Sequence, residues 1–375
     1  MTCKLNKIIP ALIVTATTGF LLSVAVDAEA ASGVCSNCHV MHASEAGTAA
    51  ATANDTLLRS TCIGCHTKDN GTGVTIAGDG TPGVLHNGVA ANSMLAGGNF
   101  KYSDTVLGDQ TYGHNPYVSG VIAADTRYTT ANPPGWKATG FSANGQVGGG
   151  SPDWTNGSNL LTCAGVYGCH GLHTADELNG AHHANKTGTD IDGSTVGSSY
   201  RFLYGIIGWE DPNYELNATA ANGDHNVYYA VDRSGGDDDV TTTANNSKTI
   251  SYFCAECHGI FHSGAANEGV SNDASMTSPW IRHPSDVVMP IGPSSSGDFD
   301  ELAAYDPNVP LGSSTVGDGT FVVGAVADRI VMCLSCHRAH ASPYPASLRW
   351  DYTEMVAGDN SKSGGCFVCH DAKND

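Results

Sequence analysis

One short pattern recurs along this chain and constrains its fold more than any other feature. Two cysteines are separated by two residues, and a histidine follows the second directly; the first copy reads Cys35-Ser36-Asn37-Cys38-His39. This spacing is the signature of covalent c-type haem attachment, in which both thiols bond to the porphyrin and the histidine ligates its iron. A chain with such sites folds around large apolar cofactors, which replace part of a side-chain core.

The pattern occurs five times with regular spacing, and a sixth copy has five residues between its cysteines. The longer loop of this sixth copy has to bulge outward if both thiols are to reach one haem edge, and Gly165 and Gly168 permit such a bulge. The predicted attachment cysteines are Cys35, Cys38, Cys62, Cys65, Cys163, Cys169, Cys254, Cys257, Cys333, Cys336, Cys366 and Cys369. The predicted proximal iron ligands are His39, His66, His170, His258, His337 and His370.

The number of cysteines supports the haem interpretation. The chain has 13 cysteines; six pairs use twelve of them, and Cys3 lies in an N-terminal segment that is expected to be cleaved. Zinc ribbons and disulfide frameworks also use paired cysteines. Neither explains why a histidine follows the second cysteine of every pair. We therefore predict six covalently attached haems c.

The remaining histidines are candidates for the opposite face of each iron. The chain has 16 histidines, and the ten outside the proximal set exceed the six that complete bis-histidine ligation would need. His42 stands one helical turn beyond His39, so it cannot ligate the same iron and is free to reach another haem. The favoured distal ligands are His42, His86, His114, His262, His283 and His340. His173, His182, His183 and His225 are held in reserve, and the His182-His183 pair or His173 is expected at the stretched site.

The segments between the attachment motifs carry little regular pattern. They are rich in Gly, Asn, Thr and Ser, with turn signals such as Asn70-Gly71 and Pro133-Pro134-Gly135, and they lack sustained helical or alternating periodicity. We expect mostly coil, with short α-helices at the attachment motifs, a few β-hairpins and the haem chain as the core. Because no linker is apparent, residues 32–375 are expected to form a single domain.

The N-terminal 31 residues predict export. They combine Lys4 and Lys7, an apolar run over residues 8–26 and a small-residue cleavage site at Ala28-Glu29-Ala30, which is typical of a signal peptide. The apolar run is long enough that an uncleaved membrane anchor is the alternative. We expect an extracellular or cell-surface protein, with the periplasm as the alternative location.

The formal net charge of −20 argues against nucleic acid as a partner. Two acidic stretches are candidate sites for Ca²⁺ or other cations, Asp190-Ile191-Asp192-Gly193 and Asp237-Asp238-Asp239. A solvated turn is the alternative interpretation of both stretches.

The motifs and their order resemble a known family, the extracellular hexahaem cytochromes of the OmcS type, which polymerise into conducting filaments. The resemblance lies in Cys35 to His42, Gly113-His114-Asn115, Cys254 to His262, Arg282-His283-Pro284, Cys333 to Ser342 and Cys366 to His370. It covers the mature chain as islands around the haems. The stretched Cys163–Cys169 spacing departs from the family pattern.

The resemblance implies that every iron has two histidine ligands and that the haems stack in an unbroken chain. It also implies that His42 crosses to an adjoining subunit and ligates the haem at Cys333, Cys336 and His337, so that the chain would be its own partner in a homopolymer. Such irons exchange electrons but have no open position for a substrate. The expected function is therefore electron transfer to redox proteins and extracellular acceptors.

Two alternatives remain open. A monomeric shuttle uses the same residues and differs only in that His42 finds its iron within its own chain. A multihaem reductase needs an iron with an exchangeable position, and the sequence lacks the Cys-x-x-Cys-Lys motif that such enzymes often use.

Overall fold

The structure is a computed structural model, and it describes a defined part of the chain. Described are residues 96–102, 111–117, 124–125, 132–136, 154, 159–174, 191–211, 219, 224–233, 246–262, 283, 285–289, 305–316 and 329–373, with the backbone of two short strands near the N-terminus. The predicted signal peptide and the first two attachment motifs lie outside the described residues. The same holds for His42, His86, His182 and His183.

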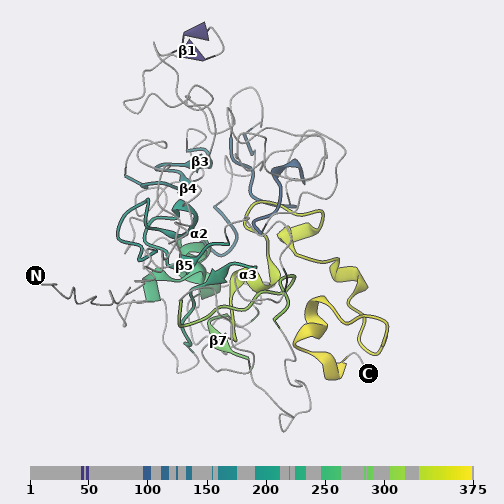
Figure 1. The fold of residues 1–375 in the computed structure, drawn as a ribbon. Coiled ribbons are helices and arrows are strands. Elements are labelled where there is room, and N and C mark those ends of the chain that lie inside the picture. Colours follow the sequence, from purple (N-terminus) through teal and green to yellow (C-terminus); the bar gives the residue numbers. More distant parts are fainter. Residues whose placement is uncertain are drawn as a thin grey trace, which may run out of the picture.

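Regular strands are short and occur only in pairs within the described part of the chain (Figure 1). β1 (Ser44–Glu45) and β2 (Thr48–Ala49) form an antiparallel hairpin, and β3 (Thr162–Ala164) pairs in parallel with β4 (Gly168–His170). Two antiparallel pairs join segments distant in sequence: β5 (Gly208–Trp209) with β6 (Val227–Tyr228), and β7 (Val287–Val288) with β8 (Ile330–Val331).

Both described α-helices contain the cysteines of an attachment motif. α2 (Ile250–His262) begins where the Thr249 hydroxyl accepts a hydrogen bond from the Tyr252 N–H at 3.1 Å, the usual arrangement of an N-terminal cap. α3 (Cys333–Cys336) is a single turn. The described 3₁₀ turns are η3 (Phe100–Tyr102), η7 (Tyr200–Phe202), η8 (Asn246–Lys248), η10 (Pro345–Ser347), η11 (Tyr352–Glu354), η12 (Gly365–Val368) and η13 (Asp371–Lys373). The predicted mostly coil fold with short helices at the motifs is confirmed.

Apolar side chains gather in small clusters beside the attachment cysteines. The largest cluster of the described residues joins η7, β6 and α2 to α3 through Tyr200, Tyr228, Ile250 and Leu334, and Cys169 packs against it. A second cluster around Tyr305 and β8 borders Cys369, and a third around Trp154 borders Cys257. In Figure 1 the green α2 lies beside α3, which begins the C-terminal part of the chain.

None of the described helices is both long and apolar enough to span a membrane.

Candidate haem sites

Helical turns set the spacing of the regular attachment motifs. Cys254 and Cys257 lie on α2, Cys333 and Cys336 bound α3, and Cys366 lies on η12 with Cys369 as its cap. Residues three apart in a helical turn lie on the same face, so each turn presents both thiols to one side. None of the eight cysteines in the described part of the chain forms a disulfide.

The stretched motif reaches the same result through strand pairing. β3 and β4 run parallel with Thr162 opposite Gly168 and Ala164 opposite His170, so Cys163 and Cys169 lie at matching positions of adjacent strands. The intervening loop turns at Gly165, whose φ of 85° favours glycine, and Val166 at its tip is 37 % exposed. A Cβ on Gly168 would overlap the backbone of Ala164. The predicted outward bulge is therefore present, and both predicted glycines take part in it.

Thiols of successive motifs lie close enough to shift one another's pKa. The thiol of Cys254 donates a hydrogen bond to Cys333, and this bond together with burial holds the pKa of Cys254 well above its ordinary value. Burial holds the pKa of Cys257 well above its ordinary value, and Cys169 of the stretched motif adds to the shift. The third, fourth and fifth motifs thus lie near one another in chain order.

The last two motifs are connected in the same way. Burial, with smaller contributions from Cys366 and Cys369, raises the pKa of Cys336 to about 12. Together with the preceding contacts, this places four of the six predicted attachment sites in one continuous series, in the order of the sequence.

Backbone carbonyls orient the described imidazoles at several of these sites. Nδ1 of a histidine lies within hydrogen-bond distance of a carbonyl oxygen in four places: His114 with Ala339 at 2.6 Å, His170 with Arg201 at 2.8 Å, His258 with Pro134 at 2.6 Å and His337 with Ala346 at 2.8 Å. An Nδ1–H that donates to a carbonyl leaves Nε2 without its proton, and a ring fixed in this way is the usual form of a metal-bound histidine.

Two of the acceptor carbonyls come from left-handed turns, which we name by their central residues. In the Arg201 turn, Arg201 and Phe202 have φ of 48° and 60°. In the Ala346 turn, Ala346 and Ser347 have φ of 59° and 56°. Positive φ at two successive non-glycine residues is rare and signals a tightly determined backbone. Sequence reasoning missed both turns, because neither carries the glycine or asparagine that marks this conformation.

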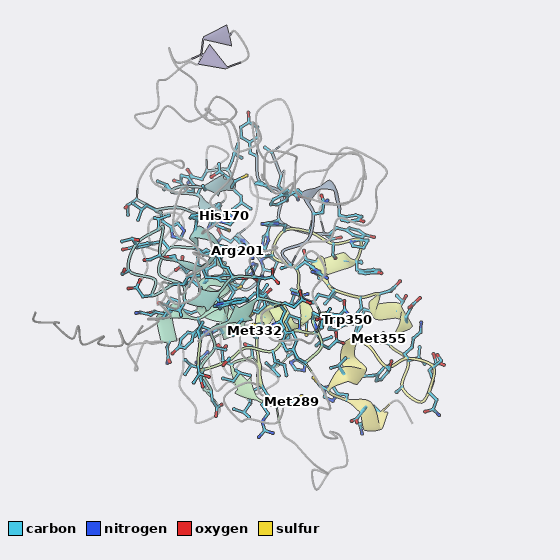
Figure 2. All side chains as sticks on the ribbon, viewed as in Figure 1. His170, Arg201, Met289, Met332, Trp350 and Met355 are labelled. Carbon is cyan, nitrogen blue, oxygen red and sulfur yellow. The ribbon has the colours of Figure 1, made fainter. Side chains whose placement is uncertain are left out.

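Each left-handed turn holds two atoms of a proximal ligand segment. Beside the bond from His170 Nδ1 to Arg201, the N–H of Gly171 donates to the Phe202 carbonyl at 2.8 Å. His170 and Arg201 can be seen near the middle of Figure 2. The Ala346 turn repeats the pattern, since the N–H of Arg338, next to His337, donates to the Ser347 carbonyl at 2.7 Å.

Burial keeps several of these imidazoles neutral. It lowers the pKa of His114 and of His337, and it lowers that of His258 to about 4, with a smaller contribution from the nearby His114. A histidine has to be neutral to ligate a metal. The surroundings therefore favour the ligand form of these rings.

Three proximal histidines have a second imidazole at a distinctive separation. The ring centroids lie 6.0 Å apart for His258 and His114, 6.3 Å for His170 and His340, and 6.1 Å for His370 and His283. Two imidazoles on opposite sides of one metal ion, each at a metal–nitrogen distance of about 2 Å, have centroids about 6 Å apart. The separation within each pair therefore matches that of two imidazoles on one iron. His114, His283 and His340 are three of the favoured distal candidates.

At the stretched site, the ring centroid of His340 lies 6.3 Å from that of His170. His182 and His183 lie outside the described residues, so the expectation of His173 or the His182-His183 pair at this site stays a prediction. His173 is buried with its Nδ1 3.5 Å from a carboxylate oxygen of Glu256, which is itself part of the fourth attachment motif. His225 stacks on Tyr305 with a centroid separation of 3.9 Å.

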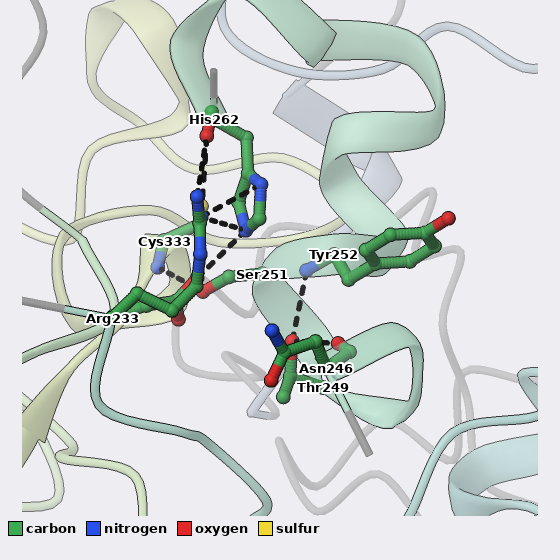
Figure 3. A network of polar contacts seen from close by, with 8 residues as sticks. Arg233, Asn246, Thr249, Ser251, Tyr252, His262 and Cys333 are labelled. Atoms are coloured by element: carbon green, nitrogen blue, oxygen red, sulfur yellow. Dashed lines mark hydrogen bonds and ion pairs between the residues drawn. The ribbon is translucent and has the colours of Figure 1, made fainter. Parts of the chain in front are cut away.

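His262 lies in a buried polar network at the end of α2 (Figure 3). Its Nε2 is 2.7 Å from an oxygen of Asp286, and Arg233 Nη1 approaches both ring nitrogens at 2.8 and 2.9 Å. In this arrangement the ring contacts a carboxylate rather than the imidazole of an attachment motif. Its role as a distal ligand stays a prediction.

The first acidic stretch forms a closed turn. A carboxylate oxygen of Asp192 accepts hydrogen bonds from the Ser194 N–H and the Ser198 hydroxyl. Hydrogen bonds from the side chain and the backbone of Ser194, and from Ser198, lower the pKa of Asp192 to about 2. Among the described residues, no group of three or more His, Cys, Asp or Glu side chains is arranged to hold a metal ion by itself. Residues 237–239 lie outside the described part, so a cation there stays a prediction.

Comparison with known proteins gives three findings. A family model described as "Doubled CXXCH motif" matches residues 324–375, which contain the last two attachment sites. The C-type cytochrome OmcS of Geobacter sulfurreducens is 26 % identical over 84 % of this chain and 78 % of its own length. Two solved structures of the OmcS filament, or nanowire, of that organism match 86 % and 88 % of this chain, with 19 % and 20 % identity and TM-scores of 0.38 and 0.40.

The repeated motifs and the sequence match define the class of protein. The chain is a multihaem c-type cytochrome, which binds haem c covalently and carries electrons rather than acting as an enzyme. Within that class it is similar to OmcS, and this similarity extends over most of both chains.

Proposed function

We propose that this chain carries six haems c in one series and conducts electrons outside the cell as the repeating unit of a filament. The observation that carries the proposal is the set of three imidazole pairs at the separation of an iron with two histidine ligands. In this proposal the last four attachment sites form a single path, supported by the Cys254–Cys333 hydrogen bond and by the electrostatic effects between the other thiols, which follow the chain order.

The haem irons would supply one-electron chemistry, and the chain would supply the histidine ligands and the groups that orient these ligands. Nε2 of His170 and of His340 would occupy the two faces of the third iron, and those of His258 and His114 the faces of the fourth. Carbonyl acceptors on Nδ1 hold three of these four rings in the ligand tautomer. Irons ligated on both faces leave no position for a substrate, which disfavours the reductase alternative.

The filament part of the proposal rests on His42 and on the relatives. OmcS structures are described as a filament and as nanowires, and the similarity to OmcS supports the same assembly here. We assign His42 to the iron held by His337 in the adjoining subunit, as the family resemblance implies. Export through a signal peptide over residues 1–31, and a single mature domain over 32–375, are parts of the same proposal.

The test is His42→Ala, with His283→Ala as a matched control. Both variants should retain six attached haems, measured by mass spectrometry, and both should gain one high-spin iron in optical and EPR spectra. Only His42→Ala should abolish filaments in electron micrographs, because His283 pairs with His370 of its own chain. Filaments of His42→Ala with fully low-spin spectra would refute the assignment.

The monomeric shuttle is the second candidate. It predicts uniform single-subunit particles of the wild-type protein in size-exclusion chromatography and negative-stain images. In that case His42→Ala would change the spin state of one iron without changing particle size.

A further inference from the structure

Two short segments enclose the residues that follow His337. Residues 96–100 lie on one side of residues 338–342 and residues 111–115 on the other, and we call the three segments together the ligand clamp. His340 N–H donates to the Gly97 carbonyl at 2.6 Å, and Asn99 N–H donates to the Ala341 carbonyl at 3.0 Å. On the other side, His114 N–H donates to the His340 carbonyl at 2.9 Å.

The clamp contains the predicted distal ligands of two different irons. The ring centroid of His340 lies 6.3 Å from that of His170, and the His340 ring stacks on Phe100 with a centroid separation of 4.4 Å. The ring centroid of His114 lies 6.0 Å from that of His258, and the Nδ1 of His114 is held by the Ala339 carbonyl. The backbone around each ligand therefore contacts the other: the Ala339 carbonyl, next to His340, holds the His114 ring, and the N–H of His114 donates to the carbonyl of His340.

The contact at the centre of the clamp requires glycine. Gly113 forms an isolated antiparallel bridge with Ala341, whose side chain is fully buried. A Cβ added to Gly113 would overlap both the Cβ of Ala341 and the carbonyl oxygen of His340. The φ of Gly113 is not positive, so its constraint is close approach rather than backbone conformation.

We infer that Gly113 is a positioning residue that sets the distal ligands of the third and fourth haems together, through its contact with Ala341 and His340. The inference rests on the proposed bis-histidine ligation. A methyl group at residue 113 would push residues 340–341 away from 113–114, and both imidazoles would move with their backbone. One substitution that touches no iron would then disturb two irons.

The experiment compares Gly113→Ala with His114→Ala, His340→Ala and Gly364→Ala in the assembled holoprotein. Each histidine variant is expected to convert one iron to high spin, quantified by EPR, and Gly113→Ala is expected to alter two. Gly364→Ala is the control, because a Cβ at Gly364 meets no atom within 4 Å. Its spectra should match those of the wild type.

A second variant separates positioning from a general folding defect. Ala341→Gly removes one of the two overlaps, so the double variant Gly113→Ala/Ala341→Gly should recover part of the low-spin signal at both sites, or part of the holoprotein yield if Gly113→Ala alone does not accumulate. Absence of any recovery would overturn the assigned contact.

The outcomes distinguish this inference from the proposed function. If His114→Ala and His340→Ala remain fully low-spin, the ligation proposal fails. If they each gain one high-spin iron while Gly113→Ala resembles Gly364→Ala, or alters only one iron, the clamp inference fails and the proposed function stands.

Discussion

The Arg201 turn and the Ala346 turn both hold a proximal imidazole with a left-handed backbone, but different contacts stabilise the two turns. Both place two successive non-glycine residues at positive φ, and both aim one carbonyl at a proximal imidazole and the next at the following N–H. The Arg201 turn is anchored by side chains. Glu210 accepts from the Arg201 N–H at 2.5 Å and pairs with its guanidinium at 3.3 Å, and Asn226 accepts from the same guanidinium at 2.9 Å.

The Ala346 turn is anchored mainly by backbone. Ala346 N–H donates to the Thr111 carbonyl at 2.7 Å, and the Ser347 hydroxyl donates to the Tyr112 carbonyl at 3.0 Å. In both turns, the unusual backbone conformation is stabilised by residues outside the turn. Because these stabilising residues differ, the two turns should respond differently to mutation.

Loss of Glu210 should have the largest effect and should act on the Arg201 turn alone. Glu210→Ala removes a partly buried ion pair and the acceptor of the Arg201 N–H, which should cost about 2 to 3 kcal/mol of unfolding free energy. The shifted carbonyl should weaken the bond to His170 and raise the reduction potential of that haem. Denaturant unfolding and spectroelectrochemistry measure the two effects.

The matched control is Glu354→Ala. Glu354 pairs with Lys362 at 2.9 Å, but both side chains are solvent-exposed, so little change is expected. An equal loss of stability in the two variants would show that the anchor at Glu210 has no special role.

Substitution of glycine at the first left-handed position should change the free energy of unfolding in opposite directions in the two turns. Ala346→Gly removes a left-handed conformation that costs a non-glycine residue about 1 to 2 kcal/mol, and the greater freedom of the unfolded chain offsets about half of this gain. We expect the free energy of unfolding to rise by about 0.5 to 1 kcal/mol. Arg201→Gly should instead destabilise, because Glu210 and Asn226 lose their partner.

The check for this pair is the denaturant midpoint of each variant under the same conditions. A shift of the same sign in both would contradict the distinction between side-chain and backbone anchoring.

The smallest effect on stability is expected from a substitution at Asp192, in the loop that precedes the Arg201 turn. Hydrogen bonds from Ser194 and Ser198 lower the pKa of Asp192 from 3.8 to about 2. A depressed carboxyl pKa adds stability above pH 3.8 that is lost as the pH falls toward 2. Because Asp192 is almost fully exposed, solvent screens most of this contribution.

Asp192→Asn should therefore flatten the acid dependence of the unfolding midpoint slightly, with a small loss of stability near neutral pH and none near pH 2. Asp351, which follows the Ala346 turn and whose pKa is lowered by Thr353, provides the equivalent position. A loss of stability that persists at pH 2 in Asp192→Asn would show that the loop depends on more than the carboxylate charge.

The sequence predicts what depends on local spacing. Short helices at Cys254 and Cys333 and the glycine-built loop after Cys163 follow from spacing and from residue type, and the structure contains them. His114, His283 and His340 also stand out in the sequence as candidates for distal ligands.

The partner of each candidate could not be predicted in the same way. The proposed pairing of His170 with His340 joins residues far apart in the chain, and the position of His340 depends on backbone contacts with residues 96–100 and 111–115. Likewise, nothing in Arg201 or Ala346 indicates positive φ, because hydrogen bonds from distant segments impose it. Long-range contacts of this kind leave no periodic signal.

The paired strands at Cys163 and Cys169 have a consequence for recognising sites of this kind. Here the parallel pairing of two strands places the two cysteines side by side, so the number of residues between them depends on the length of the loop that connects the strands. Sequence searches that require two residues between the cysteines would overlook such an attachment site. They would therefore underestimate the number of haems in exported redox proteins. The exposed tip at Val166 also offers a place where a reporter group could be inserted beside the electron path while both sulfurs keep their positions.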